Sequence, residues 1–196
     1  TGRIFIISGP SGSAKTTLLK LLRQRAGFSL DPVKIVTVTT RRPRRGEKNG
    51  RDYCFISKEE FLRRLGNREF IESQEIFGQY YATPKKELAK VIASGKDALL
   101  CIDVRGAQVV KRVFPKEAAL VFICVDKVSN LKERLRRRSS ESGEVLARRL
   151  KVARQEMGCL KHYDYAIVND VLREAVTKLS AVIIAERQRV LRNRGC

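Results

Sequence analysis

A glycine-rich stretch near the start of the chain, GPSGSAKTT at residues 9–17, constrains the fold more than any other feature. An apolar run at residues 4–7 precedes it, and a leucine-rich stretch follows it through residue 25, which predicts a strand, a tight loop and a helix. A loop of this kind presents backbone N–H groups and a helix N-terminus to one anion. We therefore predict a phosphate-binding loop made by Gly9, Pro10, Ser11, Gly12, Ser13, Ala14, Lys15, Thr16 and Thr17.

The side chains at the end of this loop indicate what it binds. Lys15 would reach the outer phosphates of a nucleotide such as ATP, and the hydroxyl of Thr16 would ligate Mg²⁺. The consensus has a second glycine before the lysine, where this chain has Ala14. If the backbone there must adopt a positive φ, an L-residue costs about 1–2 kcal/mol, or roughly tenfold in affinity. If instead the methyl group points at a phosphate oxygen, the loop must deform; the sequence leaves both alternatives open.

Strand-like runs alternate with helical patterns along the rest of the chain. The runs at residues 97–104 and 119–125 are nearly continuously apolar, which is typical of central parallel strands buried on both faces. The alternation predicts an α/β fold, a three-layer core around a central parallel sheet. Further strands are expected at residues 34–40 and 165–168, and helices at residues 85–94, 106–113, 128–138, 144–159 and 172–192.

Two regions interrupt this alternation and predict the domain organisation. Residues 34–84 contain turn signals and short alternating segments, which indicate a small mixed α+β insertion. Residues 131–150 are a highly charged helix–loop–helix, too polar for a core, and are expected to form a helical lid. The core would then comprise residues 1–33, 85–130 and 151–196.

The chain is strongly basic, with 41 Lys and Arg residues against 21 Asp and Glu residues, a formal charge of +20. Such a surface attracts polyanions, which include nucleotides, nucleic acids and anionic lipids. No apolar run approaches the roughly 20 residues that span a bilayer, so we expect no membrane partner. The five cysteines form no C-x-x-C pair, which favours reduced thiols and a cytoplasmic location.

Several motifs in order resemble the guanylate kinase family, which belongs to the P-loop nucleoside monophosphate kinases. They are TVTTRRPRRGEKNGRDYCFI, FIESQEIFGQYYATP, IDVRGAQ, RLRRRSSESGEVLARRL and AIVND, so the resemblance covers essentially the whole chain. It implies a transferase that converts ATP and GMP to ADP and GDP with Mg²⁺. Such multi-motif agreement is far more specific than a phosphate loop alone.

The resemblance implies a GMP site within the insertion. Glu72 matches the residue that accepts hydrogen bonds from guanine N1–H and the N2 amine, and Thr37 stands where the family usually has a serine. A carboxylate here would reject adenine, which lacks that donor pair. Arginine forks suit phosphate oxygens. The expected GMP-binding residues are Thr37, Arg41, Arg44, Tyr53, Glu72, Tyr81 and Asp103, and Asp103 is also expected near Mg²⁺.

The lid and the donor site follow from the same resemblance. Arg134, Arg138 and Arg149 match the lid arginines that close on the donor's phosphates, and with Lys15 and Arg41 they form the expected catalytic set. Asn169 corresponds to a residue lining the donor's adenine. The chain departs from the family at Cys101, where an acid is usual, and at Arg137 and Ser139, where glycines are common.

These departures keep a second interpretation open. Some guanylate-kinase-like domains are scaffolds that bind phosphopeptides and lack efficient catalysis, and the replacements at Ala14 and Cys101 favour that class. The retained Lys15, Thr16 and lid arginines favour the enzyme. Because the chain has no Trp, a nucleic-acid partner is left only as a side activity. We expect a monomer or a homodimer.

Overall fold

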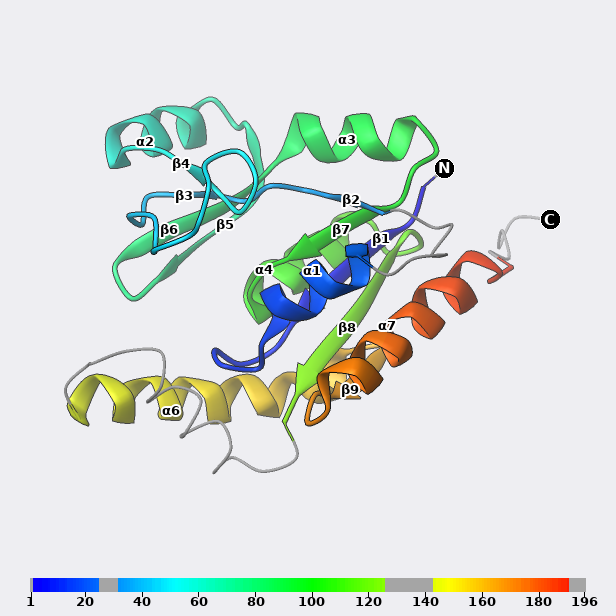
Figure 1. Ribbon diagram of the computed structural model, residues 1–196. Helices are drawn as coiled ribbons and strands as arrows, with labels where there is room; N and C mark the ends of the chain where they lie inside the picture. The colour runs from blue at the N-terminus through cyan, green and yellow to red at the C-terminus, as the bar shows by residue number, and fades with distance from the viewer. Residues whose placement is uncertain (1, 25–31, 126–142, 191–196) are drawn as a thin grey trace. The chain divides into compact units, whose positions relative to one another are not determined.

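The glycine-rich stretch joins a buried strand to an amphipathic helix. In the computed structural model, which describes residues 2–24, 32–125 and 143–190, β1 (Ile4–Ser8) is buried along its length and α1 (Lys15–Gln24) follows the loop (Figure 1). Leu18, Leu19 and Leu22 form the buried face of α1, because residues three and four apart share one side of a helix. The predicted strand, loop and helix are confirmed.

The strands form two sheets. The larger sheet has the order β2 (Val33–Lys34), β7 (Ala98–Cys101), β1, β8 (Ala118–Cys124) and β9 (Tyr165–Val168). The smaller sheet has the order β4 (Cys54–Phe55), β3 (Val38–Thr39), β6 (Gln79–Pro84) and β5 (Phe70–Ile76). β2 pairs with β7, and β8 with β9, in parallel, whereas the smaller sheet mixes both directions. The predicted α/β fold with a central parallel sheet and a small mixed sheet is confirmed.

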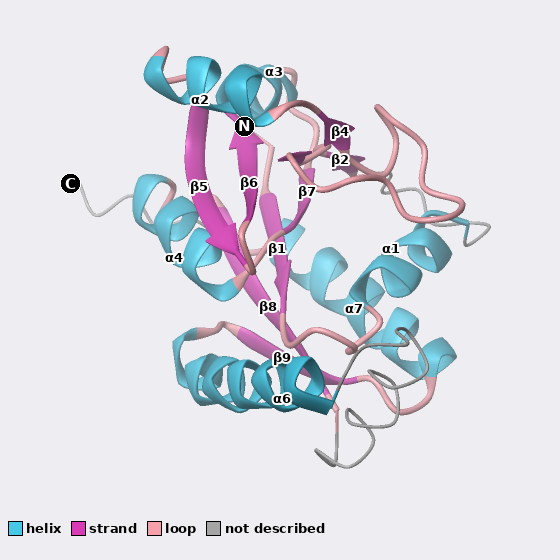
Figure 2. Ribbon diagram, turned by 90° about the vertical axis from the view of Figure 1, so that its left-hand side faces the viewer, coloured by secondary structure: helices cyan, strands magenta, loops and turns pink. Residues whose placement is uncertain are grey.

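The chain divides into two compact units, residues 1–6 with 32–118 and residues 7–31 with 119–196. In the first unit, β5 and β6 form an antiparallel hairpin, seen side by side in Figure 2. The helix α2 (Lys58–Gly66) begins at Ser57, whose hydroxyl accepts from the N–H of Glu60 at 3.1 Å. Phe61 of α2 packs with Val38 and Ala82 as the core of the mixed sheet.

Two more helices complete the first unit. α3 (Lys85–Ala93) follows β6 directly and lies against β6 and β7. α4 (Val104–Val113) begins immediately after the chain leaves β7, and Asp103 is its N-cap residue. Because α4 packs against β5, side chains that follow the end of β7 lie close to side chains of the β5–β6 hairpin.

The second unit is built on β8, which is buried on both faces. Its residues 121–124 pair in parallel with Tyr165–Val168 of β9. α6 (Gly143–Gly158) and the short 3-10 helix η1 (Cys159–His162) connect towards β9, and α7 (Leu172–Arg187) follows it. α7 packs against α1, as both views show (Figure 1, Figure 2).

The structure corrects several element boundaries, and one of them is the end of the helix predicted over residues 172–192, which stops at Arg187. Residues 34–40, predicted as one strand, are divided between β2 and β3, which belong to different sheets. The reason is a change of partner: the N–H of Ile35 donates to Leu99, whereas the carbonyl of Thr37 accepts from Cys54. The strand predicted over residues 97–104 ends at Cys101, and the helix predicted from residue 106 already begins at Val104. The helix predicted over residues 128–138 lies outside the described residues.

Candidate functional site

The phosphate loop contains three residues with positive φ: Gly9 at 139°, Gly12 at 90° and Ala14 at 61°. A Cβ atom at Gly9 would lie 2.1 Å from the carbonyl oxygen of Ile123, so a side chain there would collide with the backbone. Ala14 occupies the left-handed region that favours glycine, which costs an L-residue about 1–2 kcal/mol. The structure therefore favours the first of the two alternatives, a strained backbone.

Lys15 spans the loop that it terminates. Its Nζ atom donates to the carbonyl oxygens of Gly9 at 2.6 Å and Pro10 at 3.0 Å. Thr16 and Thr17 are exposed in the first turn of α1, where the N–H groups of a helix lack intrahelical partners. The loop thus presents a cation, two hydroxyl groups and a helix N-terminus, which together suit phosphate.

Asn169 contacts the phosphate loop from the end of β9. Its backbone N–H donates to the carbonyl of Cys124 at 2.9 Å, and its Nδ2 atom donates to the carbonyl of Ser13 at 2.8 Å. The residue is 2% exposed. The Ser13 hydroxyl is also buried and has no hydrogen-bond partner within the described residues. Asn169 follows β9, and the phosphate loop follows β1, which lies two strands away in the sheet order. The structure thus brings the Asn169 side chain to the loop backbone.

The predicted lid falls mostly beyond the part of the chain that the structure describes. Arg134 and Arg138 lie outside the described residues, as do the two family departures at Arg137 and Ser139. Arg149 is partly buried in α6.

In the first unit, Arg41 lies at the centre of a cationic and aromatic cluster. Its guanidinium carbon is 5.3 Å from the ring centroid of Tyr53 and 5.7 Å from that of Phe55. The rings of Tyr53 and Tyr81 meet edge to face at 6.1 Å. Two arginine–ring contacts and a pair of phenol groups form a clamp suited to an anion with several oxygens.

Glu47 holds this clamp together. Its Oε1 atom accepts from Arg41 at 2.9 Å, and its Oε2 atom accepts from the N–H of Arg44 at 2.7 Å. Burial alone would lower the pKa of Arg41, but the bond and charge of Glu47, with Tyr81, raise it overall. Burial raises the pKa of Tyr53 well above its ordinary value, so its hydroxyl stays protonated and can donate. The Arg44 side chain is exposed.

Glu72 is a buried carboxyl group on β5, 6% exposed. Its Oε1 atom accepts from the Thr83 hydroxyl at 2.6 Å, across the hairpin pair that joins these two residues. Burial, with a contribution from the charge of Asp103, raises the pKa of Glu72 to about 7, against the opposing effect of Thr83. Thr37 is buried as well, and its backbone carbonyl accepts from the N–H of Cys54, next to the pairing of β3 with β4.

Gly106 makes room for this carboxyl group. A Cβ atom at Gly106 would lie 2.5 Å from Glu72 Oε2 and 3.0 Å from Asp103 Oδ1. Asp103 caps α4, with Oδ1 accepting from the Gly106 N–H at 2.8 Å and Oδ2 lying 3.7 Å from Arg105 Nε. Burial raises the pKa of Asp103 despite these partners. The carboxyl groups of Glu72 and Asp103 therefore both lie against the Cα of Gly106, where a hydrogen atom fits and a methyl group does not.

The sequence prediction missed three residues of this site: Glu47, Thr83 and Gly106. A signal existed for Thr83, because a hairpin turning at residues 77–78 pairs it with Glu72. The role of Gly106 depends on how α4 packs on β5, which no local pattern encodes.

Metal binding and membrane insertion can also be judged from the described residues. Among the described residues, no group of three or more His, Cys, Asp or Glu side chains could hold a metal ion by itself. Mg²⁺ is usually bound by one or two protein oxygens, substrate phosphates and waters, so the exposed Thr16 hydroxyl fits such a site. Each helix in the described part of the chain is too short or too polar to cross a bilayer.

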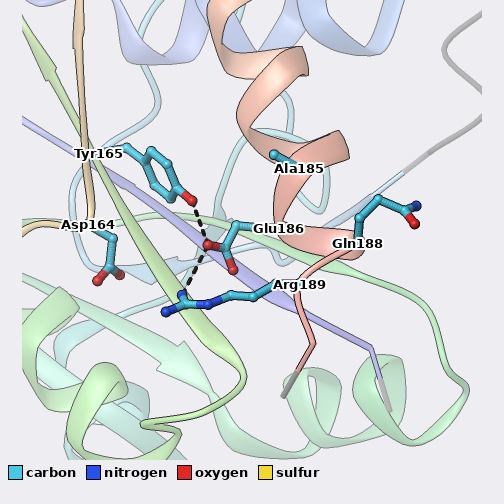
Figure 3. A pocket seen from close by; sticks show the side chains of 6 residues that line it. All are labelled: Asp164, Tyr165, Ala185, Glu186, Gln188 and Arg189. Atoms are coloured by element: carbon cyan, nitrogen blue, oxygen red, sulfur yellow. Dashed lines mark hydrogen bonds and ion pairs between the residues drawn. The ribbon is translucent and has the colours of Figure 1, made fainter. Parts of the chain in front are cut away.

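A surface pocket of about 440 Å³ in the second unit is lined by other residues, drawn in Figure 3. At its centre Glu186, 1% exposed, accepts from the Tyr165 hydroxyl at 2.6 Å and from Arg189 at 3.2 Å. The bond to Glu186, with burial, raises the pKa of Tyr165 to about 12. Tyr165, Glu186 and Arg189 thus bond to one another, as a structural tie between β9 and α7 would require.

Comparison with known proteins points to one family. A family model described as guanylate kinase matches residues 1–186. A guanylate kinase of Carboxydothermus hydrogenoformans is 39% identical over 186 residues, which cover 95% of this chain and 89% of the relative. A guanylate kinase of Maricaulis maris is 40% identical over 192 residues, covering 98% and 87%.

A solved structure agrees. The crystal structure of guanylate kinase from Anaplasma phagocytophilum matches with a TM-score of 0.80 and 34% sequence identity. The match covers 99% of this chain and 90% of that one.

Proposed function

The chain belongs to the guanylate kinase family, and from this premise we propose that it transfers the terminal phosphoryl group of ATP to GMP, yielding ADP and GDP. The observation that carries this proposal is the pairing of a buried carboxyl group, Glu72, with the Arg41 clamp in one unit. The relatives at about 40% identity are named guanylate kinase, and none of these comparisons favours the phosphopeptide scaffold.

We propose that residues 34–84 bind GMP, with Glu72 selecting the base. One carboxylate can accept from guanine N1–H and the N2 amine together, and Thr83 fixes its orientation at 2.6 Å. Thr37 would add a hydroxyl contact. Adenine would offer this buried carboxylate neither of the two guanine donors, which costs several kcal/mol in selectivity.

The monophosphate of GMP is a dianion, and four side chains are assigned to it: Arg41, Arg44, Tyr53 and Tyr81. The geometry of the Arg41 cluster supports this assignment, because a planar guanidinium beside two aromatic rings carries several N–H donors that suit phosphate oxygens. The protonated Tyr53 hydroxyl donates as well. No general base is required, since the attacking phosphate oxygen is already anionic.

The phosphate loop is assigned to the donor nucleotide. Its N–H groups and Lys15 would bind the phosphates of ATP, with Asn169 at the same site. Thr16 and Asp103 are the residues proposed to hold Mg²⁺, which supplies positive charge on the phosphate oxygens when bound. The Thr16 hydroxyl is exposed at the loop end, which supports its part.

Residues 131–150 are proposed to close as a lid over a core of residues 1–33, 85–130 and 151–196. Arg134, Arg138 and Arg149 would add positive charge to the migrating phosphoryl group and, with the closed lid, exclude water. We also propose a cytoplasmic location, supported by the four described cysteines, which form no disulfide with one another.

A coupled assay of ADP release tests the proposed function. With ATP and Mg²⁺, turnover should occur with GMP and be at least 100-fold lower with AMP, CMP or UMP, because only guanine satisfies Glu72. Removal of Mg²⁺ with EDTA should abolish turnover. GMP binding without any turnover would contradict the proposed kinase activity and would favour the phosphopeptide-binding scaffold instead.

A further inference from the structure

We propose that Asn169 is a positioning residue that holds the Ser13–Ala14 peptide of the phosphate loop in its anion-binding orientation. The proposal rests on the proposed function in so far as the anion is the phosphate of ATP. It assigns to Asn169 a role on the protein backbone, and it explains how a loop with alanine at position 14 keeps its shape.

The Asn169 side chain is a fixed donor. Its Nδ2 atom lies 2.8 Å from the Ser13 carbonyl oxygen, and its own backbone N–H is tied to Cys124 at 2.9 Å. The residue follows β9, where Val168 pairs with Cys124 in the parallel ladder. At 2% exposure the amide is shielded from water, so the bond to Ser13 has little competition from solvent.

This bond determines where the next N–H group points. The C=O of Ser13 and the N–H of Ala14 belong to one trans peptide plane and point in opposite directions. Because Asn169 holds the carbonyl on its own side, the Ala14 N–H points to the other side of the loop. That N–H is among the backbone donors by which such a loop binds phosphate.

The conformational preference of Ala14 favours a rotated orientation of the Ser13–Ala14 peptide. Its φ is 61°, and rotating the Ser13–Ala14 peptide by about 180° would bring φ to about −120°, in the broad region that L-residues prefer. Glycine accepts both orientations almost equally, whereas alanine favours the rotated one by about tenfold. The rotated peptide would present the Ser13 carbonyl oxygen to the phosphates in place of an N–H.

The hydrogen bonds on either side of the Ser13–Ala14 peptide do not prevent this peptide from rotating. The Ser13 N–H donates to the Pro10 carbonyl at 3.1 Å, and the Ala14 carbonyl accepts from Leu18 at 3.0 Å. Both groups lie outside the Ser13–Ala14 peptide plane, so they can persist while it turns. A rotation of this peptide must break the hydrogen bond from Asn169 Nδ2 to the Ser13 carbonyl.

A double-mutant cycle tests the proposal: the parent, Ala14→Gly, Asn169→Ala and the double variant. ATP and ADP binding are measured by calorimetry without GMP, so the result does not depend on turnover. Asn169→Ala should weaken ATP binding at least tenfold, since the rotated peptide becomes the favoured one. Ala14→Gly should change the parent less than threefold, because Asn169 already holds the loop. Added to Asn169→Ala, it should restore ATP affinity by about tenfold.

Two controls separate positioning from a general loss of structure. GMP affinity should be the same in all four proteins, and Asn67→Ala, at the exposed C-terminal cap of α2, should leave ATP affinity unchanged. If Asn169→Ala does not fold, Asn169→Asp removes the donor with little change of shape. The effect of its charge on ATP is common to both backgrounds and cancels in the cycle.

Thermal unfolding of the ligand-free proteins gives an independent readout. Ala14→Gly should raise Tm by about 2 °C in the parent, where the strain is present, and should not raise it in Asn169→Ala, where the loop has relaxed. Thermal unfolding tests the role of Asn169 even if the parent does not bind ATP. Absence of ATP binding would contradict the proposed function but not this role of Asn169. Equal effects of Ala14→Gly in both backgrounds, or parental ATP affinity in Asn169→Ala, would overturn the proposal.

Discussion

The buried carboxyl group of Glu72 makes the free energy of unfolding depend on pH in a defined window. Its pKa is raised from 4.5 to about 7 in the folded protein, mainly by burial. Between these values the folded protein keeps a proton that the unfolded chain releases, so stability falls as pH rises from about 4.5 to about 7. The shift corresponds to about 3 kcal/mol, fully lost above pH 7.

Glu72→Gln removes this titration and keeps an acceptor for Thr83. The variant should therefore gain stability over the parent progressively across the window, and at pH 8 its Tm should exceed the parent's by about 5–10 °C. Thermal unfolding from pH 4.5 to 8 measures the difference. Glu174→Gln, which replaces a carboxylate 65% exposed on α7, is the matched control and should follow the parent. A difference that does not change with pH would refute the reasoning.

The same carboxyl group should make guanine binding depend on pH. Recognition of N1–H and the N2 amine requires the ionised form, so guanosine should bind about tenfold more weakly at pH 6 than at pH 8. Guanosine is used because it lacks the phosphate that titrates in GMP. Glu72→Gln should bind guanosine weakly at both pH values, which separates its gain in stability from its loss of recognition.

Two further predictions concern the residues that support the clamp and the base site. Glu47→Ala releases Arg41 and should weaken GMP binding about fivefold to tenfold while leaving guanosine binding unchanged; tighter GMP binding would mean that Glu47 competes with the phosphate. Gly106→Ala places a Cβ atom 2.5 Å from the Glu72 carboxylate and should raise the KM for GMP at least tenfold, with the KM for ATP and the Tm nearly unchanged. An unaltered KM for GMP would show that Glu72 can move aside at no cost.

The sequence by itself predicted the architecture and most of the candidate residues. The strand, loop and helix around Lys15, the buried strand β8 and the mixed second sheet all follow from local patterns of apolar, glycine and β-branched residues. These patterns suffice because each reports a backbone conformation within a few residues. The motif order likewise predicted the family, which the family-model match over residues 1–186 bears out.

Only the tertiary structure decided how the candidate residues are held. The division of residues 34–40 between two sheets depends on partners at Leu99 and Cys54, far along the chain. The pKa of Glu72 depends on burial and on Asp103, and the space for it on Gly106. The loop consensus raised a positive φ at Ala14 only as one of two alternatives, and the structure decided between them. The bond from Asn169 to Ser13, 156 residues apart, has no local signature. Burial, electrostatic coupling and backbone strain arise from atoms that folding brings together, so a one-dimensional pattern does not contain them.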